Sequence, residues 1–164
     1  MRRRGQRGNA ILETAMWMPV LFLLIVGMIR FGKLTYLNYV LNKIVYNAAR
    51  NLAVAQNVNF CDPADTVTAA AISTAINDPG TGLPLISNLT ADMLVVTTQC
   101  LDSTGAIGTC DTGGCQTMAG AQRPDFVTVA IPDGYPYAMR IPYINLDPVL
   151  LRPSVTAPFG GSKL

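Results

Sequence analysis

Hydrophobic and polar positions divide the chain into a long apolar run, an amphipathic continuation and a C-terminal part with shorter patterns. From Ala10 to Ile29 the only charged residue is Glu13. A helix over these positions rises about 30 Å, the thickness of the hydrocarbon core of a bilayer. The run therefore predicts one membrane-spanning helix over about residues 10–29.

Beyond this run, hydrophobic residues recur at spacings of three and four, which is the period of one helix face. The stripe consists of Leu34, Leu37, Leu41, Ile44, Ala48 and Leu52. Neither proline nor glycine occurs between Gly32 and Pro63, so a single helix is predicted over residues 9–57, near 70 Å long at about 1.5 Å per residue. Pro19 is expected to kink or loosen it locally, because proline removes one backbone hydrogen bond.

Residues 58–164 are expected to form a small head. Asp62-Pro63 predicts the start of a second helix that ends near Ile76, since an N-cap aspartate and a first-turn proline favour helix initiation. The segments with strand periodicity are Met93–Gln99, Phe126–Ile131, Tyr137–Tyr143 and Val149–Ala157, the last demoted by Pro153 to an edge or irregular strand. These patterns predict an α+β fold in which three or four antiparallel strands pack on the outer half of the long helix.

The charge distribution gives the predicted span a direction. Four arginines, Arg2, Arg3, Arg4 and Arg7, precede the span, whereas only Arg30 and Lys33 follow it closely. By the positive-inside rule the N-terminus is expected in the cytoplasm and the head outside. Without the four arginines the chain has eight basic and ten acidic residues, a net charge of −2. This mildly acidic body does not indicate nucleic-acid binding.

The residue types available for chemistry argue against an enzyme. The chain has no histidine, which removes the commonest general base and the nucleophile–histidine pairs. Glu13 is the only glutamate and lies at the membrane. We therefore expect no catalytic residue, no cofactor and no metal site.

The four cysteines, Cys61, Cys100, Cys110 and Cys115, all lie on the outer side of the predicted span. An even number in an oxidising compartment indicates disulfides, and the Cys-x-x-Cys spacing typical of zinc sites does not occur. Bridges Cys110–Cys115 and Cys61–Cys100 would tie helix to sheet. Bridges Cys100–Cys110 and Cys61–Cys115 would staple a hairpin. The sequence does not choose between the possible pairings.

Gly8, Asn9 and Glu13 form a pattern of their own. If the chain were cut after Gly8, Asn9 would carry a free amine, with Glu13 one helical turn away. A carboxylate near an apolar span usually has a partner, and the amine of its own or a neighbouring chain would serve. The simpler reading is a glutamate that reaches into water at the headgroup level.

An ordered set of short motifs resembles the TadE-like proteins, pilin-like subunits of tight-adherence (type IVc) pilus systems. The set runs from Arg7-Gly8-Asn9-Ala10-Ile11-Leu12-Glu13 through Met18-Pro19-Val20-Leu21 and Phe31-Gly32 to Asn47-Ala48-Ala49-Arg50. The resemblance implies cleavage after Gly8 by a prepilin peptidase, with residues 1–8 as a basic leader. It also implies assembly with other pilin-like subunits through the N-terminal helix, with Glu13 as an assembly residue.

The resulting hypothesis is a structural subunit, held in the bacterial inner membrane with its N-terminus cytoplasmic before assembly into an extracellular pilus or secretion filament. The alternative is an uncleaved signal-anchor envelope protein whose head binds a partner or ligand. A cleaved secretory signal fits less well, because its apolar region spans only about 7–15 residues and ends at a small-residue cleavage site.

Overall fold

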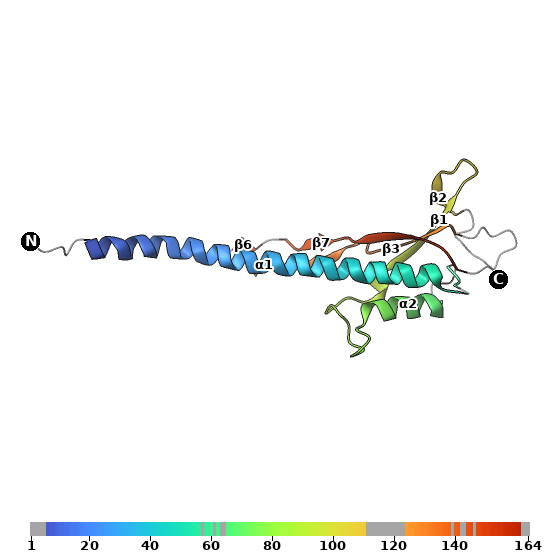
Figure 1. Ribbon diagram of the computed structural model, residues 1–164, viewed down its shortest axis with the longest axis horizontal. Coiled ribbons are helices and arrows are strands. Elements are labelled where there is room, and N and C mark those ends of the chain that lie inside the picture. The colour runs from blue at the N-terminus through green and yellow to red at the C-terminus, as the bar shows by residue number, and fades with distance from the viewer. Residues whose placement is uncertain are drawn as a thin grey trace, which may run out of the picture.

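The computed structural model describes residues 6–56, 58–60, 62, 65–110, 124–138, 140–141, 144–145 and 147–161. Its dominant element is α1 (Gln6–Val54), a helix of 49 residues that continues through Pro19. The N-terminal half projects away from the head, and the C-terminal half is packed inside it (Figure 1). The predicted long helix with an apolar N-terminal part is thereby confirmed, with its end three residues earlier than expected.

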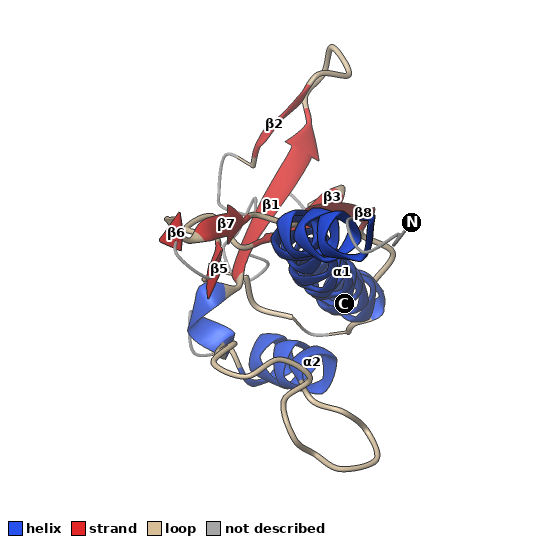
Figure 2. Cartoon of the chain, turned by 90° about the vertical axis from the view of Figure 1, so that its left-hand side faces the viewer, coloured by secondary structure: helices blue, strands red, loops and turns tan. Residues whose placement is uncertain are grey.

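The head packs α1 between a second helix and a sheet. Viewed along the long axis, α2 (Thr66–Ile76) lies on one side of α1, and strands β3 (Phe126–Ala130) and β8 (Ser154–Pro158) lie on the other (Figure 2). The N-cap of α2 is Asp65, whose carboxylate accepts hydrogen bonds from the Thr68 backbone N–H at 2.8 Å and the Thr68 hydroxyl at 2.9 Å. Because Asp65 rather than Asp62 satisfies the first free N–H groups, the helix begins later than Asp62-Pro63 predicts.

The main sheet has four antiparallel strands in the order β2-β1-β3-β8. Its strands are β1 (Val95–Leu101), β2 (Ile107–Thr109), β3 (Phe126–Ala130) and β8 (Ser154–Pro158). The 3₁₀ turn η1 (Ala91–Met93) takes up the residues just before β1, where the strand pattern predicts an earlier start. The expected antiparallel sheet of three or four strands is confirmed, although β2 lies in a segment for which no strand was predicted.

The core forms where the amphipathic part of α1 meets the sheet and α2. Six side chains in this part of α1 are fully buried, namely Leu41, Ile44, Val45, Ala48, Ala49 and Leu52. Opposite them, Val127, Val129 and Ile131 point inward from β3 and the residue after it. Burying a large aliphatic side chain contributes about 1.5–3 kcal/mol, so this contact holds the head to its own anchor helix.

A narrow two-stranded ribbon leaves the head toward the N-terminal half of α1. Its base is β4 (Tyr135–Tyr137) paired with β7 (Val149–Leu151), and its end is β5 (Arg140–Ile141) paired with β6 (Ile144–Asn145). In Figure 1, β7 and then β6 lie progressively closer to the N-terminal end of α1 than β3 does.

The ribbon corrects one strand prediction and divides another. Tyr137–Tyr143 was expected as one strand, but β4 ends at Tyr137 and β5 begins at Arg140. Val149–Ala157 was expected as an edge or irregular strand because of Pro153; it forms two strands, interrupted at Arg152-Pro153, and β8 lies at the edge of the main sheet. Pro153 lacks a backbone N–H and only accepts, from the Ile131 N–H at 3.1 Å, so the ladder breaks there and β7 pairs with β4 instead.

Candidate functional site

The N-terminal part of α1 is an apolar surface that the rest of its own chain leaves uncovered. Trp17, Phe22 and Met28 are 60%, 58% and 72% exposed, values that in a soluble protein would be unusual for a continuous run of such residues. Within the described residues one helix is long and apolar enough to cross a membrane, and its most apolar window is not buried at all. This surface needs lipid or other apolar helices around it.

Glu13 lies at the N-terminal end of a row of apolar side chains on this surface, which we call the seam. It lies on the same helix face as Trp17, Val20 and Leu24, because these positions follow it by four, seven and eleven residues. The Glu13 side chain is exposed. A shallow groove continues the seam and is lined by Val20, Leu23, Leu24, Gly27, Met28, Phe31 and Gly32. A neighbouring apolar helix laid along this seam would bring an apolar surface up to the only carboxylate of the span.

The predicted processing site belongs to the same helix. The backbone of Gly8 and Asn9 lies in α1, and the described side chains begin at Glu13. Asn9 and Glu13 are therefore one helical turn apart along the backbone. The contact predicted between the Asn9 amine and Glu13 requires cleavage after Gly8, and it stays a prediction.

In the head, Cys100 and Cys110 form a disulfide with a Cα–Cα distance of 4.9 Å. Cys100 is in β1 and Cys110 directly follows β2, so the bridge closes the hairpin that the two strands form. This is the hairpin staple among the pairings considered above. The chain-entropy estimate for a loop of this length is about 3 kcal/mol. Cys61 and Cys115 lie outside the described residues.

The turn inside this hairpin is organised by Asp102. Its carboxylate accepts hydrogen bonds from the Thr104 hydroxyl at 2.6 Å, the Thr104 N–H at 2.8 Å and the Ala106 N–H at 2.8 Å. These donors, the Thr104 hydroxyl first, hold the pKa of Asp102 below its ordinary value of 3.8. Asp102 is thus ionised at neutral pH and fixes the turn, a structural role that explains its position without a ligand.

We expect a second disulfide between the two remaining cysteines, so that the native protein has no free thiol. With Cys100 joined to Cys110, the pairing left within the chain is Cys61 with Cys115. Alkylation without reductant, followed by peptide mass analysis, should give one linked peptide for each pair and no alkylated cysteine. Alkylation of either Cys61 or Cys115 in the native protein would contradict this expectation.

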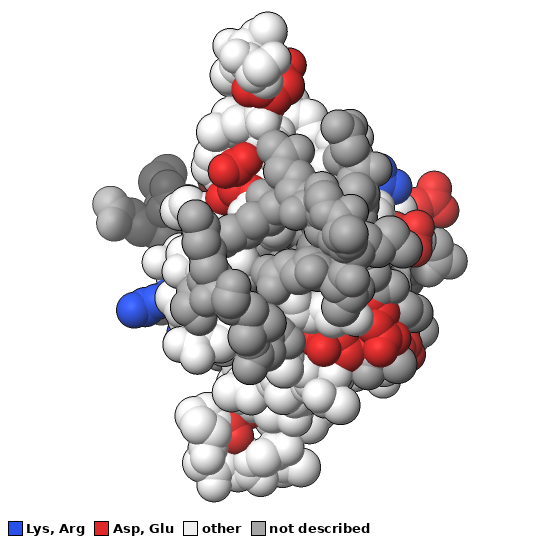
Figure 3. Space-filling model, turned by 90° about the vertical axis from the view of Figure 1, so that its right-hand side faces the viewer, with Lys and Arg blue, Asp and Glu red and all other residues white. Residues whose placement is uncertain are grey.

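The end of the head farthest from the apolar span carries mainly acidic side chains among its charged groups (Figure 3). Among the residues that the structure describes, no three Cys, Asp or Glu side chains are grouped so that they could hold a metal ion. The most distinctive chemical feature of the described chain is therefore the apolar part of α1 with Glu13 at its start.

Comparison with known proteins points to the same segment. Residues 8–50 match the family described as TadE-like protein, which confirms the resemblance seen in the motifs. The matched segment begins at Gly8, contains Asn9 and Glu13, and ends within the part of α1 that is buried in the head. The chain matches no curated protein and no solved structure. The match and the apolar helix together fit a membrane-anchored, pilus-associated protein.

Proposed function

We propose that this protein is a structural, pilin-like subunit that is anchored in the bacterial inner membrane and then assembles into or onto a tight-adherence pilus or secretion filament. The observation that carries the proposal is the uncovered apolar half of α1, which coincides with the segment matched to the TadE-like family. Such a helix is stable in lipid before assembly and in a bundle of similar helices afterwards, because both surroundings exclude water from it.

In this proposal Glu13 makes assembly selective. Prepilin peptidase cuts after Gly8, and the new amine of Asn9 is left with a positive charge at the edge of the apolar bundle. Glu13, on its own chain or on a neighbour, neutralises that amine when the helices leave the lipid. A buried charge without a partner costs several kcal/mol, roughly, so a subunit out of register along the bundle would be disfavoured.

The second candidate is an uncleaved signal-anchor protein whose head binds an envelope partner. It is favoured by the head itself, which has a hydrophobic core of its own and a hairpin closed by a disulfide. The two functions differ in the first residue of the mature protein.

We expect the protein isolated from its own host to begin at Asn9, with or without an added methyl group. Intact mass and N-terminal sequencing measure this directly, and the same preparation from a host lacking the prepilin peptidase is the control. A mature protein that begins at Met1 in both hosts would contradict processing and favour the signal-anchor function.

A further inference from the structure

The outer face of the main sheet carries both polar and apolar side chains, since the exposed Val95 and Leu101 share it with Thr97. A row of threonines crosses it, one from each of β1, β3 and β8. The Thr97 hydroxyl donates to the Thr128 carbonyl oxygen at 3.4 Å, and the hydroxyl oxygens of Thr128 and Thr156 are 2.8 Å apart. This face is what an antiparallel sheet presents when one side packs on a core and the other meets water.

Apolar side chains dominate this face where the chain enters the ribbon. Side chains alternate between the two faces of a strand, so Leu150 lies on the side of Ser154 and Thr156. Leu150 is 48% exposed and pairs across the ribbon with the exposed Pro136. The other face carries Val149, which is 39% exposed, opposite Tyr137. At this point both faces of the ribbon are apolar or aromatic; the face of Leu150 is exposed, and the face of Val149 and Tyr137 is partly covered.

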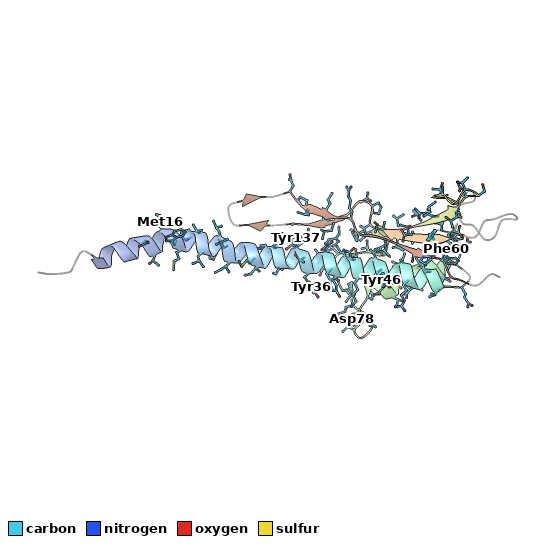
Figure 4. The ribbon with its side chains drawn as sticks, turned by 45° about the horizontal axis from the view of Figure 1, so that its top comes forward. Met16, Tyr36, Tyr46, Phe60, Asp78 and Tyr137 are labelled. Carbon is cyan, nitrogen blue, oxygen red and sulfur yellow. A yellow bond between two sulfur atoms is a disulfide. The ribbon has the colours of Figure 1, made fainter. Side chains whose placement is uncertain are left out.

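The base of the ribbon is fixed to the head, so its direction is set by the fold. Tyr135 and Leu151 pack against the core, and the Tyr135 hydroxyl donates to the Ser87 carbonyl oxygen at 2.7 Å. Figure 4 shows Tyr137 on the ribbon beside the middle of α1, on the side toward Met16 and away from Phe60.

The ribbon reaches back to the level where the apolar run of α1 ends. The position along α1 can be counted from Gly160, which is level with Ala53 because its N–H donates to the Ala53 carbonyl oxygen at 2.8 Å. Ten extended residues from Gly160 back to Leu150 cover at most about 33 Å, the rise of about 22 helical residues. Leu150 therefore lies no nearer the span than about the level of Phe31, and β6 lies closer to the N-terminal end of α1 than β7 does (Figure 1).

We propose that the ribbon rests on the outer surface of the membrane, with Leu150 and Val149 in the interfacial layer of the phospholipids. This rests on the proposed function, because it requires α1 to span the bilayer. The residue types agree with such a position: Tyr137 and Arg140 in the ribbon and Arg30 and Lys33 in α1 are of the kinds that gather at membrane–water interfaces. The head then contacts the membrane at two places, α1 and the ribbon, which fixes its tilt before assembly.

The single tryptophan of the chain makes the proposal testable in the full-length protein. The protein is reconstituted into vesicles of phosphatidylethanolamine and phosphatidylglycerol that carry a nitroxide quencher either on the headgroup or deep on the acyl chain. Native Trp17, near the middle of the predicted span, reports on the span. In a Trp17→Phe background, Leu150→Trp reports on the ribbon, with Val149→Trp as a second probe and Ile107→Trp in the exposed β2 as control.

We expect the headgroup quencher to lower Leu150→Trp and Val149→Trp emission by about twofold, as for a side chain in the interface. The deep quencher should act on Trp17, and neither quencher should act on Ile107→Trp. If Trp17 is quenched while both ribbon probes behave like the control, the ribbon proposal is wrong and the membrane span stands. A blue shift of the ribbon probes without lipid quenching also overturns it and indicates a protein partner. If Trp17 itself is not quenched, the membrane anchor fails and the ribbon proposal fails with it.

Discussion

Replacing Glu13 with alanine is expected to abolish filament assembly while the protein remains in the membrane. The change removes the only carboxylate of an otherwise apolar run, so insertion becomes easier by up to about 3 kcal/mol. In the proposed filament the same change leaves the amine of Asn9 without its counter-charge. The effects on insertion and on assembly are thus opposite in sign, which a general folding defect would not produce.

The measurement compares membrane-fractionated protein with sheared surface filaments from the same cells. Glu13→Gln keeps the shape of the side chain without its charge and should fail as alanine does. Met16→Ala is a suitable control, because Met16 is 71% exposed on the same part of α1 but carries no charge (Figure 4). Normal piliation in Glu13→Ala cells would exclude the charge-pairing mechanism.

Truncating Leu52 to alanine is expected to destabilise the head by about 2–5 kcal/mol, the cost of deleting a buried leucine side chain and leaving a cavity. Leu52 is fully buried in the core between α1 and the sheet. Domains are stable by only about 5–15 kcal/mol, so the loss is a large part of the total. The substitution tests the packing of α1 in the head and not its insertion in the membrane, because Leu52 lies well outside the apolar span.

Denaturant unfolding of the detergent-solubilised full chain, followed by far-ultraviolet circular dichroism, gives this free energy. Val54→Ala is the matched control, since Val54 is on the same last turn of α1 and is 68% exposed, so its change should stay within about 0.5 kcal/mol. Equal effects of the two substitutions would mean that the packing of α1 in the head is not as described.

The long helix could be predicted from the sequence because its signal is local and repeated over many turns. The stripe from Leu37 to Leu52 has one period throughout, and the structure buries most of it. The strands were harder, because their pairing joins residues far apart in the chain. Nothing near Val149 indicates that it pairs with Tyr137 while Ser154, a few residues on, pairs with Ala130.

The disulfide pairing likewise could not be predicted from the local sequence. Both short loops, Cys100 to Cys110 and Cys110 to Cys115, suit a bridge, and the sequence alone leaves the choice open. It is decided by the β1–β2 register, in which Cys100 stands opposite Gly108 and Gln99 opposite Thr109. The strand β2 was missed because three residues with a central glycine carry almost no periodic signal. The apolar outer face of the ribbon was missed for another reason, since exposure of Leu150 becomes visible only once its strand has a known face.

The place of β8 has a consequence for how the protein is made. The helix α1 is synthesised before β8, but its buried side chains are covered by that strand, which ends at Pro158. Phe159, the residue after β8, packs edge-to-face on Phe60, with ring centres 5.6 Å apart. In the proposed function α1 is already in the membrane while its outer half stays uncovered, until β8 has been exported as well. During this interval the nascent subunit is the form most open to proteases and chaperones.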